Sequence, residues 1–256
     1  MPTKIITIAN QKGGVAKTTT AINLAHGLAM KGKRTLLIDL DPQGQVAKFI
    51  GVESSAGVYV LLMNEAESQE ALTYLRSQVK PSGRDNLWII PGNKKTILAQ
   101  NEISQTPIDH VRRALAIFTG RVIDFIILDT SPSVGGLQER AIWASDLLII
   151  PTAPEYAALD GVTQLFRDAL ALQKEKGWQG GLLGVLPTLY DEQTRMSRES
   201  MDSLRTTFGT RLLPPIHRAT VLRDCTAEGL TVFEKDAACR AAEEYHTLVD
   251  LVLRAE

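Results

Sequence analysis

The residues best placed to do chemistry in this sequence form a glycine-containing loop near the N-terminus. The loop spans residues 10–19 (NQKGGVAKTT), follows a short apolar run and leads into a segment of helical period. Backbone N–H groups of such a loop bind phosphate, and the helix N-terminus adds positive potential. Lys17 would reach the β- and γ-phosphates of a nucleotide, and the Thr18 hydroxyl would ligate Mg²⁺. The predicted phosphate-binding residues are Gly13, Gly14, Val15, Ala16, Lys17, Thr18 and Thr19.

This loop departs from the ordinary G-x-x-x-x-G-K-[ST] pattern, because Gln11 and Ala16 occupy the two glycine positions. It reads instead K-G-G-x-x-K-[ST], with Lys12 placed before Lys17. A second cation near the phosphates would neutralise charge that develops during phosphoryl transfer. The methyl group of Ala16 should restrict the loop and affect the catalytic rate more than nucleotide binding. The alternative, a glycine turn between solvated lysines, is disfavoured by the strand before it and the helix after it.

Aspartates stand where two apolar runs end. Asp39 and Asp41 close the run that begins at Thr35, and Asp129 follows Val122–Leu128. Ligands of open α/β sheets bind at the carboxyl ends of the strands, so these carboxylates should meet the phosphate loop there. Asp129 matches a Walker B position, which holds Mg²⁺ directly or through water. For Asp39 and Asp41 the alternative is a structural turn before Pro42.

Short apolar runs alternate with longer segments of helical period, of which Gly161–Lys176 is an example. Runs that are apolar on both faces are typical of parallel strands covered by helices on each side. We therefore predict one α/β domain over residues 1–256, with a doubly wound, mainly parallel sheet flanked by helices. Residues 52–86 are the least regular part and are predicted to form peripheral helices and loops. The predicted strands are Ile5–Ala9, Thr35–Leu40, Leu87–Ile90, Val122–Leu128, Leu147–Ile150, Leu182–Leu186 and, as the weakest, Arg211–Pro214.

The composition narrows the functional classes. With 256 residues, 44% of them hydrophobic, and a formal net charge of -1, the chain can bury a core and is not basic overall. Cys225 and Cys239 do not make a disulfide framework and are expected to be reduced thiols. The four histidines are scattered and receive no catalytic role. The N-terminus lacks the features of a signal peptide and no apolar run would span a bilayer, so a cytoplasmic protein is expected.

Positive charge is concentrated between Arg195 and Arg223. Six arginines against two acids, Glu199 and Asp202, give this segment a charge of +4 in a chain whose total is -1. Arginine binds phosphate through paired hydrogen bonds, and such contacts produce sequence-independent, salt-sensitive binding to nucleic acid. An ordinary solvated helix face is the alternative. The predicted DNA-binding residues are Arg195, Arg198, Arg218 and Arg223.

The loop with Lys12, the D-x-D-P-Q-G segment 39–44 and the D-T-S-P-S segment 129–133 resemble the ParA/MinD family of deviant Walker-type ATPases. The resemblance runs nearly end to end and is strongest to short ParA partition ATPases, which have no N-terminal helix-turn-helix domain. It implies a slow ATPase that uses ATP and Mg²⁺, closes as a homodimer over two nucleotides and binds DNA non-specifically. Such a protein segregates plasmids or chromosomes, or positions a cargo such as carboxysomes or chemoreceptor clusters. It is nucleoid-associated and is stimulated by an adaptor, ParB-like or specific to the cargo, with a short basic N-terminal segment.

The resemblance also implies roles for single residues. Lys12 would reach the partner's ATP, Asp39 would position the attacking water, and Asp41 would belong to a Mg²⁺-sensing switch. Glu155, in the segment 151–156, would lie near the dimer interface, and Pro187 and Thr188 beside the adenine. The sequence departs from the family at three positions: Ala16 for glycine, Ser131 for proline and Gln193 for an arginine.

Two rival classes fit less well. A MinD-like ATPase ends in a basic amphipathic helix that binds anionic lipid, whereas residues 243–256 carry four acids against Arg254. The apolar stripe of Tyr245, Leu248, Val249 and Val252 predicts a helix docked on the protein's own core. A metabolic P-loop enzyme would need a visible acceptor site, and an iron–sulfur reductase would need more cysteines.

Overall fold

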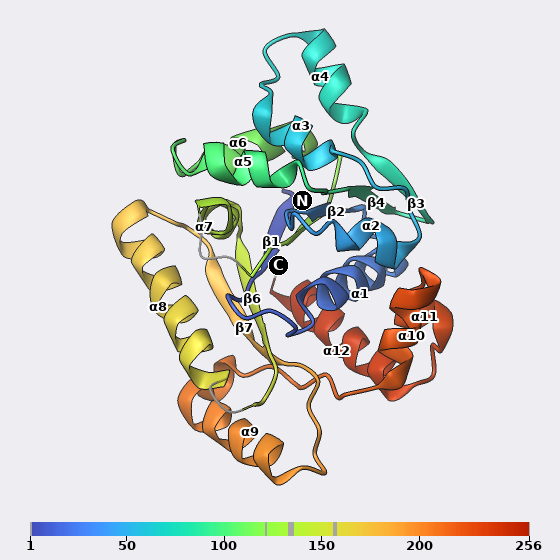
Figure 1. The fold of residues 1–256 in the computed structure, drawn as a ribbon, viewed down its shortest axis with the longest axis vertical. Coiled ribbons are helices and arrows are strands. Elements are labelled where there is room, and N and C mark those ends of the chain that lie inside the picture. Colours follow the sequence, from blue (N-terminus) through green and yellow to red (C-terminus); the bar gives the residue numbers. More distant parts are fainter. Residues whose placement is uncertain (1, 121, 133–135, 156–157, 256) are drawn as a thin grey trace.

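The fold is a twisted sheet between layers of helices (Figure 1), seen in a computed structural model that describes residues 2–120, 122–132, 136–155 and 158–255. Within these residues the sheet has seven strands in the order β3-β4-β2-β5-β1-β6-β7. Their bounds are β1 Lys4–Ile8, β2 Thr35–Asp39, β3 Lys80–Arg84, β4 Leu87–Ile90, β5 Phe125–Asp129, β6 Leu147–Thr152 and β7 Gly181–Pro187. All neighbouring pairs are parallel except β3 with β4. The predicted doubly wound, mainly parallel α/β fold is confirmed.

Helices connect the strands and cover both faces of the sheet. The α-helices are α1 Lys17–Met30, α2 Gln45–Ile50, α3 Gly57–Met63, α4 Gln69–Arg76, α5 Thr96–Ile103, α6 His110–Leu115, α7 Gly136–Ala144, α8 Ala158–Lys176, α9 Arg195–Phe208, α10 Thr220–Glu228, α11 Val232–Lys235 and α12 Arg240–Arg254. Short 3₁₀ turns occupy Ala116–Phe118 and Gly209–Arg211.

The central strands are buried on both faces, and their side chains alternate between two cores. Leu37 of β2 packs in the core formed with α1 and α12, whereas its neighbours Leu36 and Ile38 pack in the core under α3, α5, α6 and α7. A third core joins β6 and β7 to α8 and α9. Because the side-chain period of a strand is two, continuous apolar runs such as Phe125–Leu128 supply both layers at once.

The structure corrects the sequence prediction in two places. Residues 52–86 contain not only helices but also strand β3, which pairs antiparallel with β4 at the edge of the sheet. Its sequence, KPSGR, has low strand propensity, and Pro81 is tolerated because an edge strand has one unpaired side. The predicted strand Arg211–Pro214 is wrong: it is a 3₁₀ turn followed by a single bridge from Leu212 to Val185.

The C-terminal helix docks on the core, as its apolar stripe predicts. Tyr245, Val249 and Val252 of α12 are fully buried in the core that contains α1, and α12 lies beside α1 in Figure 1. In the part of the chain that the structure describes, no helix combines the length and apolar character needed to cross a membrane.

Close packing of α1 on α12 leads to a stability prediction. A Cβ atom added at Gly27 would lie 2.5 Å from a methyl carbon of Val249 and 3.3 Å from the Phe233 ring, whereas one added at Gly161 in α8 meets nothing within 4 Å. We expect Gly27→Ala to lower the free energy of unfolding by about 1–3 kcal/mol through overpacking. The matched change Gly161→Ala should raise it by about 0.5–1 kcal/mol, because alanine favours helix. Urea titration measures the free energy of unfolding of both variants. Equal changes in the two variants would contradict the close packing of Gly27 against α12.

Candidate nucleotide site

The predicted site residues meet at the carboxyl edge of the sheet. In the strand register Asp129 of β5 lies between Ile8 of β1 and Asp39 of β2. The phosphate loop leaves β1 at this edge and enters α1. It borders a cavity of about 400 Å³, which Asp41, Gln43 and Gln45 also line. The structure therefore brings together the loop and the carboxylates that the sequence predicted to be close.

Neighbouring strand ends hold the phosphate loop in place. The Asn10 amide donates to the carbonyl of Pro151 at the end of β6 (2.6 Å), and its oxygen accepts from the Lys12 N–H (2.9 Å). The Thr188 hydroxyl, beyond β7, donates to the carbonyl of Val15 (3.0 Å). These bonds fix both halves of the loop before any ligand binds, so its backbone N–H groups are preorganised for an anion.

Ala16 is held in a conformation that favours glycine. It precedes α1 with φ 58° and ψ 33°, in the left-handed helical region. An alanine there costs about 1–2 kcal/mol relative to ordinary backbone. The glycine that the family pattern places here would adopt this conformation without strain. The phosphate loop of this chain is therefore strained at Ala16. The sequence alone predicted only that the Ala16 methyl group would restrict the conformation of the loop.

Lys17 is buried at the base of the loop. Its side chain is 7% exposed, and its ammonium group donates to the carbonyl of Lys12 at 2.8 Å. Burial lowers the pKa of Lys17, against the opposing attraction of Asp129 and Asp41. A buried cation with one carbonyl partner has donor capacity left for a phosphate oxygen. This position suits the predicted contact with the β- and γ-phosphates.

Asp129 is the most unusual group in the site. It is fully buried, and neither carboxylate oxygen has a hydrogen-bond partner among the described residues. Burial raises the pKa of Asp129, and the charge of Asp41 adds to that shift. The Thr18 hydroxyl, which is close to the carboxylate without meeting the geometry of a hydrogen bond, and the charge of Lys17 oppose it. An unpartnered buried carboxylate is costly unless a cation or a donor completes it. With Thr18 and Asp41 close by, the oxygen ligands present fit Mg²⁺.

Asp39 is also fully buried, but both of its oxygens are engaged. They accept from the backbone N–H groups of Asp41 (3.1 Å) and Val46 (3.0 Å). Burial and the neighbouring charge of Asp129 raise the pKa of Asp39 well above its ordinary value. In this conformation Asp39 organises the segment 41–46 that leads into α2. Each oxygen keeps a further lone pair, and the predicted contact with a water stays a prediction.

Lys12 lies at the outer rim of the site and forms an ion pair within its own chain. Its ammonium group is 2.8 Å from a carboxylate oxygen of Glu155, and both side chains are partly exposed. The two residues predicted to lie at a dimer interface are thus in contact with each other. The last residues of the segments 151–156 and 129–133, Tyr156 and Ser133, lie outside the described residues.

Two side chains of the cavity were missed by sequence reasoning. Phe49 of α2 and Leu189 after β7 line it, and Leu189 has φ 53°. No local motif marks either residue, because only tertiary packing brings α2 to the phosphate loop. Of the predicted adenine neighbours, Thr188 is fully buried and supports the loop, while Pro187 ends β7 in register with Thr152.

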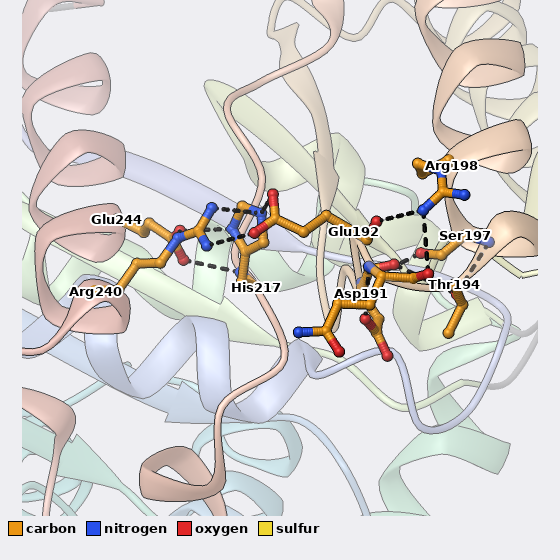
Figure 2. A network of polar contacts seen from close by, with 9 residues as sticks. Asp191, Glu192, Thr194, Ser197, Arg198, His217, Arg240 and Glu244 are labelled. Carbon is orange, nitrogen blue, oxygen red and sulfur yellow. Dashed lines mark hydrogen bonds and ion pairs between the residues drawn. The ribbon is translucent and has the colours of Figure 1, made fainter.

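The four predicted DNA-binding arginines fall into two groups. Arg195 and Arg198 begin α9; Arg195 pairs with Glu199 (2.6 Å) and has an 86% exposed side chain, while Arg198 donates to the carbonyls of Glu192 and Gln193. Arg218 and Arg223 instead line a cavity next to the phosphate loop. The segment 190–194 contacts both groups: the N–H of Arg218 donates to the carbonyl of Tyr190, and Arg198 donates to the carbonyls of Glu192 and Gln193. Figure 2 shows the polar contacts of Glu192 with Arg198 and Arg240.

The strain at Ala16 predicts a stability change. Ala16→Gly should raise the free energy of unfolding by about 0.5–1 kcal/mol, because relief of the left-handed conformation exceeds the added flexibility of the unfolded chain. Ala21→Gly, at a buried position of α1 with ordinary helical geometry, should lower it by about 1 kcal/mol or more. Thermal and urea unfolding of both variants test this. A loss of stability in Ala16→Gly would show that the loop is unstrained.

Known proteins match this chain over most of its length. A family model described as an AAA domain (AAA_31) matches residues 3–178. The chromosome-partitioning ATPase Soj of Thermus thermophilus is 34% identical over 249 residues, covering 97% of this chain and 94% of its own. The chromosome partitioning protein ParA of Caulobacter vibrioides is 32% identical over 262 residues, covering 100% and 96%.

Solved structures agree with the fold. The cobyrinic acid a,c-diamide synthase of Mycobacterium smegmatis with bound ATP analog and magnesium superposes with a TM-score of 0.80 at 29% identity, covering 98% of this chain and 95% of that one. Together with the phosphate loop, its preceding lysine and the carboxylates at the sheet edge, these matches establish the family. The chain belongs to the ParA/Soj/MinD family of P-loop ATPases.

Proposed function

We propose that this chain binds Mg·ATP at the carboxyl edge of the sheet, closes as a homodimer over two nucleotides and holds DNA non-specifically until hydrolysis releases it. The observation that carries the proposal is the juxtaposition of buried Lys17 and unpartnered Asp129 below an anchored phosphate loop. A cation and a triphosphate together would compensate both buried charges. The names of the matched relatives, which refer to chromosome partitioning, support segregation of DNA as the purpose of the cycle.

In this proposal Thr18, Asp41 and Asp129 hold Mg²⁺, which supplies charge neutralisation at the phosphates when bound. Asp39 has a second task. Its oxygens hold the N–H groups of Asp41 and Val46 in the segment 41–46 and keep further lone pairs with which it positions the attacking water. Asp39 thereby links the conformation of that segment to hydrolysis and suits a slow, partner-stimulated enzyme.

Lys12 acts from the opposite subunit in the closed dimer. In the single chain it pairs with Glu155 in partly exposed surroundings, and such a pair contributes only about 0.2–1 kcal/mol. Exchange of this partner for the phosphates of a second subunit's nucleotide is therefore inexpensive. The negative charge of the triphosphate, in a water-excluded interface, attracts the ammonium more strongly than one exposed carboxylate.

An adaptor completes the cycle by stimulating hydrolysis, either a ParB-like protein or one that belongs to a positioned cargo such as a carboxysome or a chemoreceptor cluster. The buried apolar face of α12 leaves no free amphipathic surface there for a membrane, so the proposal involves no lipid. The protein acts in the cytoplasm over the nucleoid.

Dimer formation should depend on ATP and on Lys12. We expect Asp39→Asn and Asp39→Ala, which slow hydrolysis, to double the molar mass in light scattering when Mg·ATP is saturating and not with Mg·ADP. Lys12→Ala in the same background should bind nucleotide yet remain monomeric, because the loop amides and Lys17 are intact. A chain that stays monomeric with saturating ATP, in both Asp39 variants, contradicts the closed dimer.

DNA binding should depend on the exposed arginines of α9. We expect Arg195→Gln with Arg198→Gln to weaken binding of unrelated duplexes equally and to lower the salt slope of log affinity by about 0.9 for each phosphate that the variant no longer neutralises. Arg218→Ala with Arg223→Ala should weaken DNA binding as well, because these residues belong to the same predicted patch. Arg113→Gln, at an exposed arginine of α6 that pairs with Asp109, is the control and should change DNA affinity by less than about threefold. Fluorescence anisotropy in the ATP-bound state measures all three, and equal affinities for the patch variants and the control would contradict the predicted DNA site.

A further inference from the structure

A cavity between α7 and α8 has no part in the proposed reaction. Its volume is about 470 Å³, which is within the range of small-molecule sites. Side chains of α7 and α8, which lie next to each other in Figure 1, form its walls, and Gln11 of the phosphate loop also lines it. We call this space the α7–α8 cavity. Its lining residues determine which class of ligand fits.

The α8 wall of the cavity carries a carboxylate at each end of an apolar stretch. The residues of α8 at positions i, i+3, i+4 and i+7 share one face of the helix, and those that line the cavity in this way are Asp168, Ala171, Leu172 and Glu175. Two helical turns separate the backbones of Asp168 and Glu175 by about 10 Å. This wall therefore matches a chain that is charged at both ends and apolar in the middle.

The two carboxylates of the α8 wall have no cationic partner among the described residues. The one lysine that lines the cavity, Lys176, already pairs with Glu139 of α7 (2.6 Å). Asp168 accepts only from neutral amides of the described chain, one of which is the amide of Gln11 (3.1 Å), and Glu175 forms no hydrogen bond or ion pair with a described residue. The cavity therefore carries uncompensated negative charge, which attracts a cationic ligand.

The α7 wall contains a buried acceptor that lacks a donor. Gln138 lines the cavity and is 5% exposed. Its amide nitrogen donates to the carbonyl of Ser131 (3.0 Å) and, at a longer distance, to the hydroxyl of Thr130 (3.4 Å). No described residue donates to the amide oxygen of Gln138. Buried acceptors are usually paired, so a ligand with N–H donors would complete this group.

We propose that the α7–α8 cavity binds a linear aliphatic polyamine, whose terminal ammonium groups lie at Asp168 and Glu175. The methylene groups of the chain pack on Leu172 of α8 and Ile142 of α7, and an N–H group reaches the amide oxygen of Gln138. An ammonium group is only a donor, which suits carboxylate and amide oxygens alike. Among the described residues no three metal-ligating side chains converge on a metal site, so the separated carboxylates suit an extended cation.

The α7–α8 cavity touches the nucleotide site at two points. Gln11 of the phosphate loop donates to Asp168, and Gln138 holds the carbonyl of Ser131, which follows Asp129 by two residues. An ammonium group at Asp168 competes with Gln11 for the same carboxylate. A bound polyamine is therefore placed to regulate the nucleotide cycle; this consequence rests on the proposed function, whereas polyamine binding itself does not.

Calorimetry on the nucleotide-free protein tests the site with octane-1,8-diamine, whose ammonium groups are far enough apart to reach both carboxylates. We expect one molecule to bind per chain, at least about tenfold more tightly than propane-1,3-diamine, which has the same charge and fewer methylene groups to bury. Spermidine should compete with octane-1,8-diamine. Absence of binding, or equal affinities of the two diamines, overturns the proposal. Because no nucleotide is present, neither result bears on the proposed ATPase.

Paired variants locate the diamine. Asp168→Asn with Glu175→Gln should weaken octane-1,8-diamine at least about tenfold, because both charge-assisted hydrogen bonds are lost. Glu65→Gln with Glu67→Gln is the matched control: it removes two exposed carboxylates that line a different cavity and should change the affinity by less than about threefold. Circular dichroism confirms the fold of each variant. Equal weakening by the two pairs would show general attraction to negative charge and overturn the proposal.

Ala171→Lys fills the cavity from within the chain. This half-buried position lies between the two carboxylates on the cavity side of α8, so the new side chain carries its own ammonium group into the site. We expect the variant to fold, because lysine favours helix, and to lose diamine binding. Leu170→Lys, at an exposed position of α8 that does not line the cavity, is the control and should bind normally. Unchanged binding by Ala171→Lys would place the diamine elsewhere and overturn the proposal.

Discussion

The structure depends on one electrostatic constraint, the burial of opposite charges at the sheet edge without full compensation. Lys17 begins α1 and Asp129 ends β5, and each is removed from water. A buried ion that lacks partners weakens the folded state, so a chain that retains one commonly uses it for binding. The surrounding strands leave little freedom to relieve the cost, since β5 is buried along its whole length. In the proposed function, a bound metal–nucleotide complex compensates both groups.

Hydrogen bonds to neighbouring strand ends hold the phosphate loop in place, and its backbone is strained at Ala16. Asn10 and Thr188 anchor it to the ends of β6 and β7, and Ala16 and Leu189 carry left-handed backbone at the two cavities. Anchoring on neighbouring strands is what allows such conformations to persist, because the loop cannot relax without breaking those bonds. The site therefore combines preorganised donors with backbone strain at Ala16 and Leu189.

The parts of the site that lie in one continuous stretch of sequence could be predicted from that sequence. The parts that tertiary packing brings together from distant stretches could not. The phosphate loop and Asp129 depend on a strand, a turn and a helix in succession, which the order of residues reveals directly. Phe49 and Leu189 reach the cavity only through the packing of α2 and of the segment after β7, which no local pattern encodes. Strand β3 was missed for a related reason: KPSGR pairs because β4 offers a free edge, not because its own residues favour extension. For Thr188 the sequence indicated the neighbourhood, and the structure adds a hydrogen bond from its hydroxyl to the phosphate loop that no local pattern reveals.

The segment 189–194 connects the cavity beside the phosphate loop to both groups of arginines, because Arg218 and Arg198 each donate hydrogen bonds to its carbonyls. It begins at strained Leu189, which lines the cavity beside the phosphate loop, and ends at Thr194, whose side chain caps α9. Arg198 of α9 donates back to the carbonyls of Glu192 and Gln193, and Glu192 pairs with Arg240 of α12 (Figure 2). A displacement of this segment would therefore move the carbonyls that orient Arg198. A DNA surface that responds to nucleotide needs a short, hydrogen-bonded connection of this kind, and an arginine patch without it would bind DNA in every nucleotide state.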